Sequence, residues 1–288
     1  MPPKVIPNIP SQQGQQYRPP QGQQLPAQQT PLQPQQLPVQ RAQQSAARRP
    51  PPRMPMPVDA AAAACPPGLE YLCVLDQLVI KQQIELFEVL VGFETQNKYL
   101  ACNNQGQSVY YMVESSDFCT RCCISDARCF QMFVVDNQCR AVMRFVRPLR
   151  CESTFRNCCF CCLLQDMQVE TPPNQLVGSV REVCSVCQPT FHVCDTSGKP
   201  VLRVQGPVIT TSCPGAMDVK YKILTLNGKE IGIISKLWGG VLKEMLTDAD
   251  TFSVTFPVDL DVRVKACLIG CAMLFDYMYF ETDAQDRS

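Results

Sequence analysis

The sequence is poor in histidine and tryptophan, with one of each among 288 residues, and it carries no net charge. Twenty-six basic residues balance 26 acidic ones, so there is no basic field of the kind that indicates a nucleic-acid-binding protein. His192 has no second acid–base residue converging on it, which favours a structural role. P-loop, GxGxxG, GxSxG and HExxH motifs are absent as well. These absences weigh against an enzyme that makes or breaks covalent bonds.

Long apolar runs are also missing. The first ten residues, MPPKVIPNIP, lack the apolar core of a secretory signal, so we expect a cytosolic chain with reduced thiols. The most apolar stretch, residues 266–280, is shorter than the ~20 residues that a spanning helix needs. We expect a helix over 262–280 that protein encloses, with a bilayer span as the alternative. Asp276 lies inside this stretch and needs a partner in either case.

Proline and glutamine are abundant instead, and they gather in residues 1–68. This segment offers almost no aromatic or branched apolar side chain to bury, so we expect it to be disordered and partly polyproline II. Residues 31–34 and 52–55 fit the PxxP pattern that SH3-type domains bind. A plain linker is the alternative interpretation, since such matches arise by chance in a proline-rich segment.

From residue 69 to 282 the sequence consists of short alternating runs separated by turn residues, with a short tail over 283–288. About twelve such runs predict a mainly β domain, either a barrel or a sandwich. The Asn227-Gly228 pair favours a type I′ hairpin. Short helices are expected over 69–79, 115–127 and 238–246.

Cysteine is also abundant, with 19 residues, an odd number that excludes complete internal pairing. Four of them fall within five residues: Cys158, Cys159, Cys161 and Cys162. C-x₂-C spacing recurs at Cys119/Cys122 and Cys184/Cys187, so zinc binding is one interpretation. Adjacent thiols also suit S-acylation beside a membrane, and two or more acyl chains anchor a protein stably. Most other thiols are expected to pack as small apolar residues.

Three aspartates flank a short apolar run near the end of the sequence: Asp248, Asp250 and Asp259. As positions 1, 3 and 12 of a loop, they would offer the hard oxygen ligands that Ca²⁺ prefers. The pattern departs from an EF-hand, because Phe252 and Ser253 replace a ligand and a glycine of that loop. A simple turn before a strand is the alternative.

Several separated motifs resemble the phospholipid scramblases. They are GLEYL and DQLVIKQQIELFEVLVGFETQNKY within 68–99, RPLRC at 147–151, the cysteine cluster, SKLW at 235–238, and TDADTFSVTFPVDLDVRVKACLIGCAMLFDYMYFE at 247–281. The resemblance covers essentially residues 68–282, and the Pro/Gln-rich start is similar too. It implies a tubby-like barrel of twelve strands around a hydrophobic C-terminal helix.

The resemblance also implies ATP-independent, Ca²⁺-activated, bidirectional movement of phospholipids between leaflets, at the plasma membrane and mostly facing the cytoplasm. In the family's pattern Asp248, Asp250 and Asp259 would bind Ca²⁺, and the four clustered cysteines would carry acyl chains. Phe160 stands where the family usually has proline. Ile233 and Leu237 replace a lysine and a histidine that some members carry in a nuclear-import segment, here residues 232–240, which argues against nuclear entry.

A different class of function remains open at this stage. An acylated, non-enzymatic adaptor or lipid-responsive regulator would use the PxxP motifs for SH3-type partners. Membrane phospholipids are expected partners in both interpretations, and assembly into a homo-oligomer is compatible with either.

Overall fold

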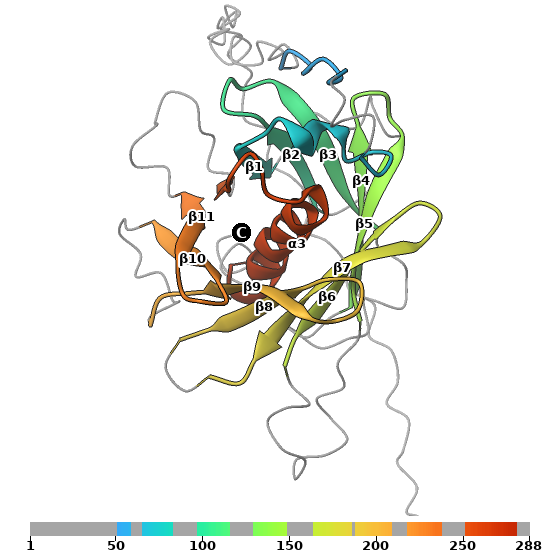
Figure 1. Ribbon diagram of the computed structural model, residues 1–288. Coiled ribbons are helices and arrows are strands. Elements are labelled where there is room, and N and C mark those ends of the chain that lie inside the picture. The colour runs from blue at the N-terminus through green and yellow to red at the C-terminus, as the bar shows by residue number, and fades with distance from the viewer. Residues whose placement is uncertain are drawn as a thin grey trace, which may run out of the picture. The chain divides into compact units, whose positions relative to one another are not determined.

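The computed structural model describes residues 51–58, 65–82, 97–115, 129–148, 164–185, 188–208, 218–237 and 251–280. Twelve antiparallel strands among them close into one barrel, in which β1 pairs with β12 (Figure 1). This confirms the prediction of a mainly β, roughly twelve-stranded barrel. The strands are β1 (Gln77–Gln82), β2 (Lys98–Cys102), β3 (Ser108–Ser115), β4 (Phe130–Asp136), β5 (Ala141–Arg147), β6 (Asp166–Thr171), β7 (Gln175–Val183), β8 (Thr190–Cys194), β9 (Pro200–Gln205), β10 (Val219–Thr225), β11 (Glu230–Leu237) and β12 (Thr251–Thr255).

Alternation along the strands explains why the sheet closes around a core. In β4, Phe130, Met132 and Val134 are buried, whereas Gln131 and Phe133 lie on the outer face. A period of two is what a strand with one buried face requires. Each large apolar side chain that is fully buried adds about 1.5–3 kcal/mol of hydrophobic stabilisation. The closed sheet leaves no strand edge unpaired around the barrel.

The two ends of the barrel differ in how the strands are connected. At one end, which we call the turn end, tight turns join β2–β3, β4–β5, β6–β7, β8–β9 and β10–β11. At the other end, which we call the far end, β1, β3, β5, β7, β9 and β11 finish and the following strands begin. The longer connecting sequences are therefore attached at the far end.

Glycines occupy three of the tight turns at the turn end. Gly106, Gly198 and Gly228 have φ of 75°, 80° and 83°, a left-handed conformation that glycine adopts without a Cβ penalty. Asn227 does not share the positive φ, so the prediction of a type I′ hairpin here is wrong. A hydrogen bond from Gly228 N–H to the Thr225 carbonyl, 2.9 Å, and a register shift in β10 indicate a turn with a bulge instead.

Helix α3 (Val262–Tyr279) runs through the middle of the barrel (Figure 1). Asp261 caps it, because its carboxylate accepts the Arg263 N–H at 2.7 Å. Residues 265–277 are all buried, as expected for a helix that is apolar on every side. Phe275 stacks on Tyr221 with ring centroids 4.1 Å apart. Protein therefore encloses the apolar stretch, and among the described residues no helix is long and apolar enough to cross a membrane.

The helix predicted over residues 69–79 is a single 3₁₀ turn, η1 (Glu70–Cys73), followed by β1. Leu69 and Leu72 are buried at helical spacing, but Leu78 and Ile80 follow the period of a strand. Apolar residues three apart fit a continuous helix as well as a 3₁₀ turn followed by a strand, so the prediction of a helix over 69–79 is wrong. Apart from Ser115, which ends β3, the helices predicted over 115–127 and 238–246 lie outside the described residues.

Residues 51–58, which we call the strap, lie against the barrel at the turn end. Met54 N–H donates to the Ser108 carbonyl at 2.9 Å, and Ser108 N–H donates to the Pro52 carbonyl at 2.8 Å. Met54 and Met56 pack against the core. The chain thus contacts the barrel upstream of residue 69, where we expected the domain to begin.

Candidate functional site

Of the three predicted Ca²⁺ ligands, Asp248 and Asp250 lie outside the described residues. Asp259 is exposed in the connection between β12 and α3, at the turn end. Just before it, Phe256 N–H donates to the Asp76 carbonyl at 2.9 Å, so the pairing of β1 with β12 continues beyond the strand. In the part of the chain that the structure describes, His, Cys, Asp and Glu do not form any group of three or more that could hold a metal ion.

Strand β12 lies between Asp259 and the sequence positions of the other two aspartates. It pairs with β1 on one side and β11 on the other, from Thr251 to Thr255. At ~3.3 Å per residue the strand spans ~13 Å, whereas two oxygens on one Ca²⁺ lie at most ~5 Å apart. Residues 251–255 are therefore extended between the two ends of the barrel and do not wrap around an ion.

The predicted acylation cluster, Cys158, Cys159, Cys161 and Cys162, also lies outside the described residues. So do three further cysteines of the zinc interpretation: Cys119, Cys122 and Cys187. The strand ends that flank the cluster are Arg147 of β5 and Asp166 of β6, and both lie at the far end. Cys184, just after β7, is exposed at the same end. The far end is thus where the cluster is attached to the barrel.

A network of buried polar groups surrounds the C-terminal part of α3 at the far end. The Tyr277 hydroxyl donates to Glu114 Oε2 at 2.8 Å, and Asn97 Nδ2 donates to the same oxygen at 2.9 Å. Gln82 Nε2 donates to Asn97 Oδ1 at 3.1 Å. Strands β1 and β3 and the residue before β2 are thereby bonded to the helix, which fixes its position at this end.

Asp276, the acidic residue inside the apolar stretch, has the partner that the sequence required. The Tyr99 hydroxyl donates to Asp276 Oδ2 at 2.6 Å, within the barrel. Nearby, the Lys236 ammonium lies 3.9 Å from the centroid of the Phe280 ring and 5.5 Å from that of Phe252. Such cation–π contacts stabilise a buried ammonium group. A tyrosine of the barrel wall thus donates a hydrogen bond to the acidic residue at this end of the helix.

A second polar group at the far end links β5, β6 and β7. Arg147 donates from Nε and Nη2 to Gln165 Oε1 at 3.0 and 2.8 Å. Gln165 N–H donates to Glu182 Oε2 at 2.9 Å. Burial raises the pKa of Glu182, and the hydrogen bond from Gln165 together with the charge of Arg147 partly offsets this. These contacts fix the strands that flank the cysteine cluster.

Lys265 holds the turn end together from inside. Its fully buried ammonium group donates to the carbonyl oxygens of Val258, Leu72 and Leu75 at 2.7, 2.8 and 2.9 Å. The Phe256 ring lies 5.1 Å away. Burial lowers the pKa of Lys265. One side chain thus bonds the first turn of α3 to η1 and to the connection after β12.

The described cysteines on α3 behave as packing residues. Cys267 and Cys271 are buried within the barrel, and burial raises the pKa of Cys267 to about 12. A buried thiol with so high a pKa is protonated at neutral pH and is a poor nucleophile. His192 is half-buried on β8 opposite Arg181 and Arg203, which agrees with a structural role.

Sequence reasoning missed the buried charged residues of both ends. Glu114, Arg147, Lys236 and Lys265 are each at most 2% exposed. Three of them lie at or next to the end of a strand, where a charged side chain is normally expected to be exposed to solvent. Lys265 had a weak signal, because it directly precedes an unbroken apolar run at the predicted start of a buried helix.

The closed twelve-stranded barrel around an apolar helix defines a tubby-like protein. A family model, Scramblase, matches residues 54–282. Phospholipid scramblase 2 of Bos taurus is 45% identical over 231 residues, which cover 80% of this chain and 76% of the relative. Phospholipid scramblases 1 and 4 of Homo sapiens are 44% and 39% identical over 234 and 236 residues, covering 81% of this chain in both cases and 72% and 70% of those proteins. The chain belongs to the scramblase family.

Proposed function

We propose that this chain moves phospholipids between the leaflets of a membrane, in both directions, with Ca²⁺ as activator and without ATP. The observation that carries the proposal is the family match over residues 54–282, which spans the whole barrel and α3. The relatives are named for phospholipid scrambling and are 39–45% identical to this chain over aligned stretches of 231–236 residues. The absence of a P-loop in the sequence supports independence from ATP.

We further propose that the far end faces the plasma membrane and that the turn end faces the cytoplasm. Acyl chains on Cys158, Cys159, Cys161 and Cys162 would anchor the chain between Arg147 and Asp166, and both of these lie at the far end. Asp250 directly precedes β12, whose first residue is at the same end. A lipid anchor and a Ca²⁺ site attached to one end would place both at the lipid surface.

Ca²⁺ binding is proposed for Asp248 and Asp250, carboxylates that suit this hard cation. The extended strand β12 separates Asp259 from these two aspartates. The experiment below therefore tests separately whether Asp259 binds the same ion. Two protein carboxylates leave several coordination positions to water or lipid phosphate. Low affinity and direct contact between the ion and headgroups follow from such an open site.

Reconstitution tests both parts of this proposal. The purified full chain in vesicles with leaflet-reporter lipids should exchange lipids on addition of Ca²⁺ without ATP. Asp250→Asn should abolish the Ca²⁺ response, and Asp259→Asn, which removes a matched carboxylate at the turn end, should retain it. Exchange that is absent in the unmodified chain would refute direct scrambling. Equal loss in both variants would instead assign Asp259 to the site.

Acylation is tested separately in cells. Substitution of all four clustered cysteines by serine should release the chain from membranes, and hydroxylamine, which cleaves thioesters, should release the unmodified chain. Cys184→Ser is the matched control, since this exposed thiol lies at the same end outside the cluster. Membrane association that persists after both treatments would contradict an acyl anchor.

Residues 232–237, part of the segment that corresponds to a nuclear-import signal in some relatives, belong to β11. This strand pairs with β10 and with β12, so its backbone is occupied on both sides. An import receptor that reads an extended peptide cannot reach it in the folded protein. The plasma membrane remains our proposed location.

A second candidate function is that of a tethered adaptor for SH3-type partners. The observation that favours it is the exposure of Pro52, Arg53 and Pro55 on the surface of the strap. Two prolines with a basic neighbour suit an aromatic-lined groove with an acidic rim. Binding of a purified SH3 domain to the chain, lost on Pro52→Ala with Pro55→Ala, would support this function.

A further inference from the structure

The strap rests on the barrel along one edge. Its half-buried residues include three at a spacing of three: Pro51, Met54 and Pro57. The residues that follow each of them are exposed: Pro52, Pro55 and Val58. A repeat of three is that of a polyproline II helix, which has three side-chain edges. One edge therefore lies against the barrel together with Met56 of the next edge, and the edge that carries both prolines of the PxxP motif faces solvent.

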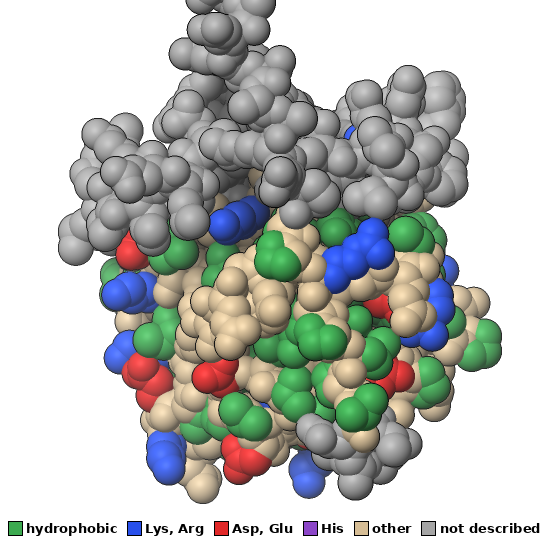
Figure 2. Space-filling view, turned by 90° about the horizontal axis from the view of Figure 1, so that it is seen from above, with side chains coloured by type: hydrophobic (Ala, Val, Ile, Leu, Met, Phe, Trp, Pro, Cys, Tyr) green, Lys and Arg blue, Asp and Glu red, His purple; other side chains and the backbone are tan. Residues whose placement is uncertain are grey.

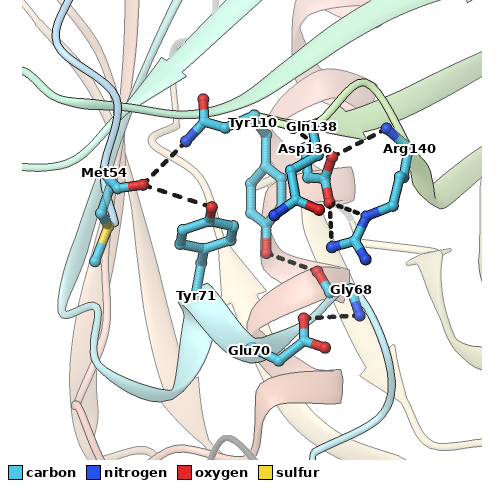
Figure 3. A network of polar contacts seen from close by, with 9 residues as sticks. Met54, Gly68, Glu70, Tyr71, Tyr110, Asp136, Gln138 and Arg140 are labelled. Carbon is cyan, nitrogen blue, oxygen red and sulfur yellow. Dashed lines mark hydrogen bonds and ion pairs between the residues drawn. The ribbon is translucent and has the colours of Figure 1, made fainter. Parts of the chain in front are cut away.

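The barrel binds the backbone of the strap as well as its side chains. Asn137 Nδ2 and the Tyr71 hydroxyl both donate to the Met54 carbonyl, at 3.2 and 3.5 Å (Figure 3). Ser108 bonds to the strap on its other side, through its carbonyl to Met54 N–H and through its N–H to the Pro52 carbonyl. Met54, one of the two residues between the prolines of the motif, forms hydrogen bonds through both its N–H and its carbonyl, more than any other residue of the strap in the described contacts.

The groups that hold the strap are themselves fixed in place (Figure 3). Asp136 accepts hydrogen bonds from Gln138 N–H at 2.8 Å and from Arg140 N–H at 2.9 Å, which orders the turn that carries Asn137. The Tyr110 hydroxyl donates to the Gly68 carbonyl at 3.0 Å, and Gly68 N–H donates to Glu70, which positions η1 and Tyr71. A preformed surface of this kind binds a peptide with little ordering cost.

We propose that the strap is a ligand of its own barrel, and that docking on the barrel and binding of a partner's SH3-type groove exclude each other. Such a groove grips a polyproline II ligand across two of its three edges. The barrel occupies the edge of Met54, adjacent to the proline edge, and bonds the Pro52 carbonyl. A partner must therefore displace the strap before it can bind the complete motif. This inference rests on the second candidate function.

The test compares one motif in three settings. The probe is a purified SH3 domain, selected from a panel because it binds a synthetic peptide of residues 47–58. It is titrated against that peptide, against the full chain carrying Pro7→Ala, Pro10→Ala, Pro31→Ala and Pro34→Ala so that residues 52–55 are the single PxxP match that remains, and against variants of this chain. Asn137→Ala weakens the surface that holds the strap. Met56→Ser removes an apolar contact of the strap outside the PxxP motif and leaves every barrel residue unchanged. The synthetic peptide with the same substitution shows whether the change affects binding to the SH3 domain directly.

We expect the full chain to bind the domain at least ~10-fold more weakly than the peptide does, and each variant to recover ~3–10-fold, the effect of losing one or two hydrogen bonds or a small apolar contact. Asn227→Ala, which changes an exposed amide in another turn at the same end, should leave the affinity for the domain unchanged.

Equal affinity of chain and peptide would overturn the exclusion while leaving the adaptor function intact. Weaker binding by the variants would show instead that the barrel presents the motif. A peptide that binds none of the domains would refute the adaptor function and this inference with it.

Discussion

At the scale of single residues, buried charges carry much of the organisation of this barrel. Lys265 is the clearest case, because its buried ammonium group donates hydrogen bonds to three backbone carbonyls. A buried group left without its hydrogen bond costs about 1–3 kcal/mol. The side chain is thus more important for assembling the turn end than for charge balance at a surface.

We expect Lys265→Met to lower the free energy of unfolding by about 3–5 kcal/mol, since the apolar stem is kept and three hydrogen bonds are lost. Urea unfolding followed by circular dichroism measures the change. Arg263→Met is the control on the same turn of α3, and it should shift stability by less than about 0.5 kcal/mol because Arg263 is exposed. Equal effects of the two substitutions would contradict the role given to Lys265.

Two buried tyrosines allow a matched comparison of hydroxyl groups. Tyr99 donates to Asp276 at 2.6 Å, so Tyr99→Phe should destabilise the protein by about 1–3 kcal/mol. The Tyr221 hydroxyl is buried without a hydrogen-bond partner among the described residues, so Tyr221→Phe should be neutral or stabilising. Thermal unfolding of the two variants measures the difference. The reverse order would show that Tyr99 does not hold the end of α3.

At the scale of elements, much of the structure followed from pattern. Alternation in β4 and the all-round apolarity of α3 each point to one structure, because period and burial agree there. Residues 69–79 do not point to one structure. Leucines three apart fit a helix, and they fit equally well a 3₁₀ turn followed by a strand. The ends of α3 were beyond prediction, because their partners Glu114 and Leu72 are remote in sequence.

The enclosure of α3 predicts which thiols react with a polar alkylating reagent. At pH 8 iodoacetamide should modify the exposed Cys139 and Cys184 and spare the buried Cys267 and Cys271. The thiolate is the reactive form, and burial raises the pKa of Cys267 to about 12, so a rise to pH 10 should not expose it to reaction in the folded protein. Mass spectrometry of the digested protein reads each site.

The same shift in pKa has a consequence for stability. In the unfolded chain the Cys267 thiol ionises near pH ~8.5, whereas in the folded protein it keeps its proton up to about 12. Its contribution is therefore complete below pH ~8.5 and is lost as the pH rises towards 12. Rapid alkylation of Cys267 at pH 8 without unfolding would contradict a helix enclosed by protein.

Close approach of α3 to β7 predicts a strong effect at one glycine. A Cβ on Gly178 would lie 2.6 Å from both the Cys267 Sγ and the Cys194 carbonyl oxygen, so Gly178→Ala should destabilise by about 1–3 kcal/mol or more. A Cβ on Gly270 would meet Val169 Cγ2 at 3.2 Å, a contact that small movements relieve, and alanine favours the helix. Gly270→Ala should therefore cost far less in a urea titration. Similar losses of unfolding free energy at both positions would contradict the close packing of α3 against β7 at Gly178.

At the scale of the whole molecule, the sequence supported a barrel of about twelve strands but not the difference between its ends. Short turns such as the one at Gly106 are local and were recognisable from their residues. That Asp259 belongs to one end and the start of β12 to the other follows only from strand order and direction. On the face that Figure 2 shows, acidic and basic side chains are interspersed over the described surface, so charge on this face does not indicate the orientation either.

Two native cysteines at opposite ends can test the proposed orientation on membranes. Cys139 lies in the β4–β5 turn, and Cys184 follows β7 at the far end. With nitroxide labels on these residues and the chain bound to vesicles, relaxation by lipid-soluble oxygen should be stronger for Cys184. Relaxation by a water-soluble nickel complex should be stronger for Cys139. Labels that respond alike, or in the opposite sense, would refute a membrane-facing far end.

The pairing of β1 with β12 also bears on how the protein is made. Gln77 and Ser253, which share a hydrogen bond, are 176 positions apart, and the helix that fills the barrel comes later still. Non-local contacts of this kind are costly to form early in folding. While a ribosome is still synthesising residues 251–280, the preceding eleven strands have neither a closing neighbour nor a filled interior. Native closure must therefore wait until β12 and α3 are available, and until then the apolar strand faces are exposed and prone to aggregation.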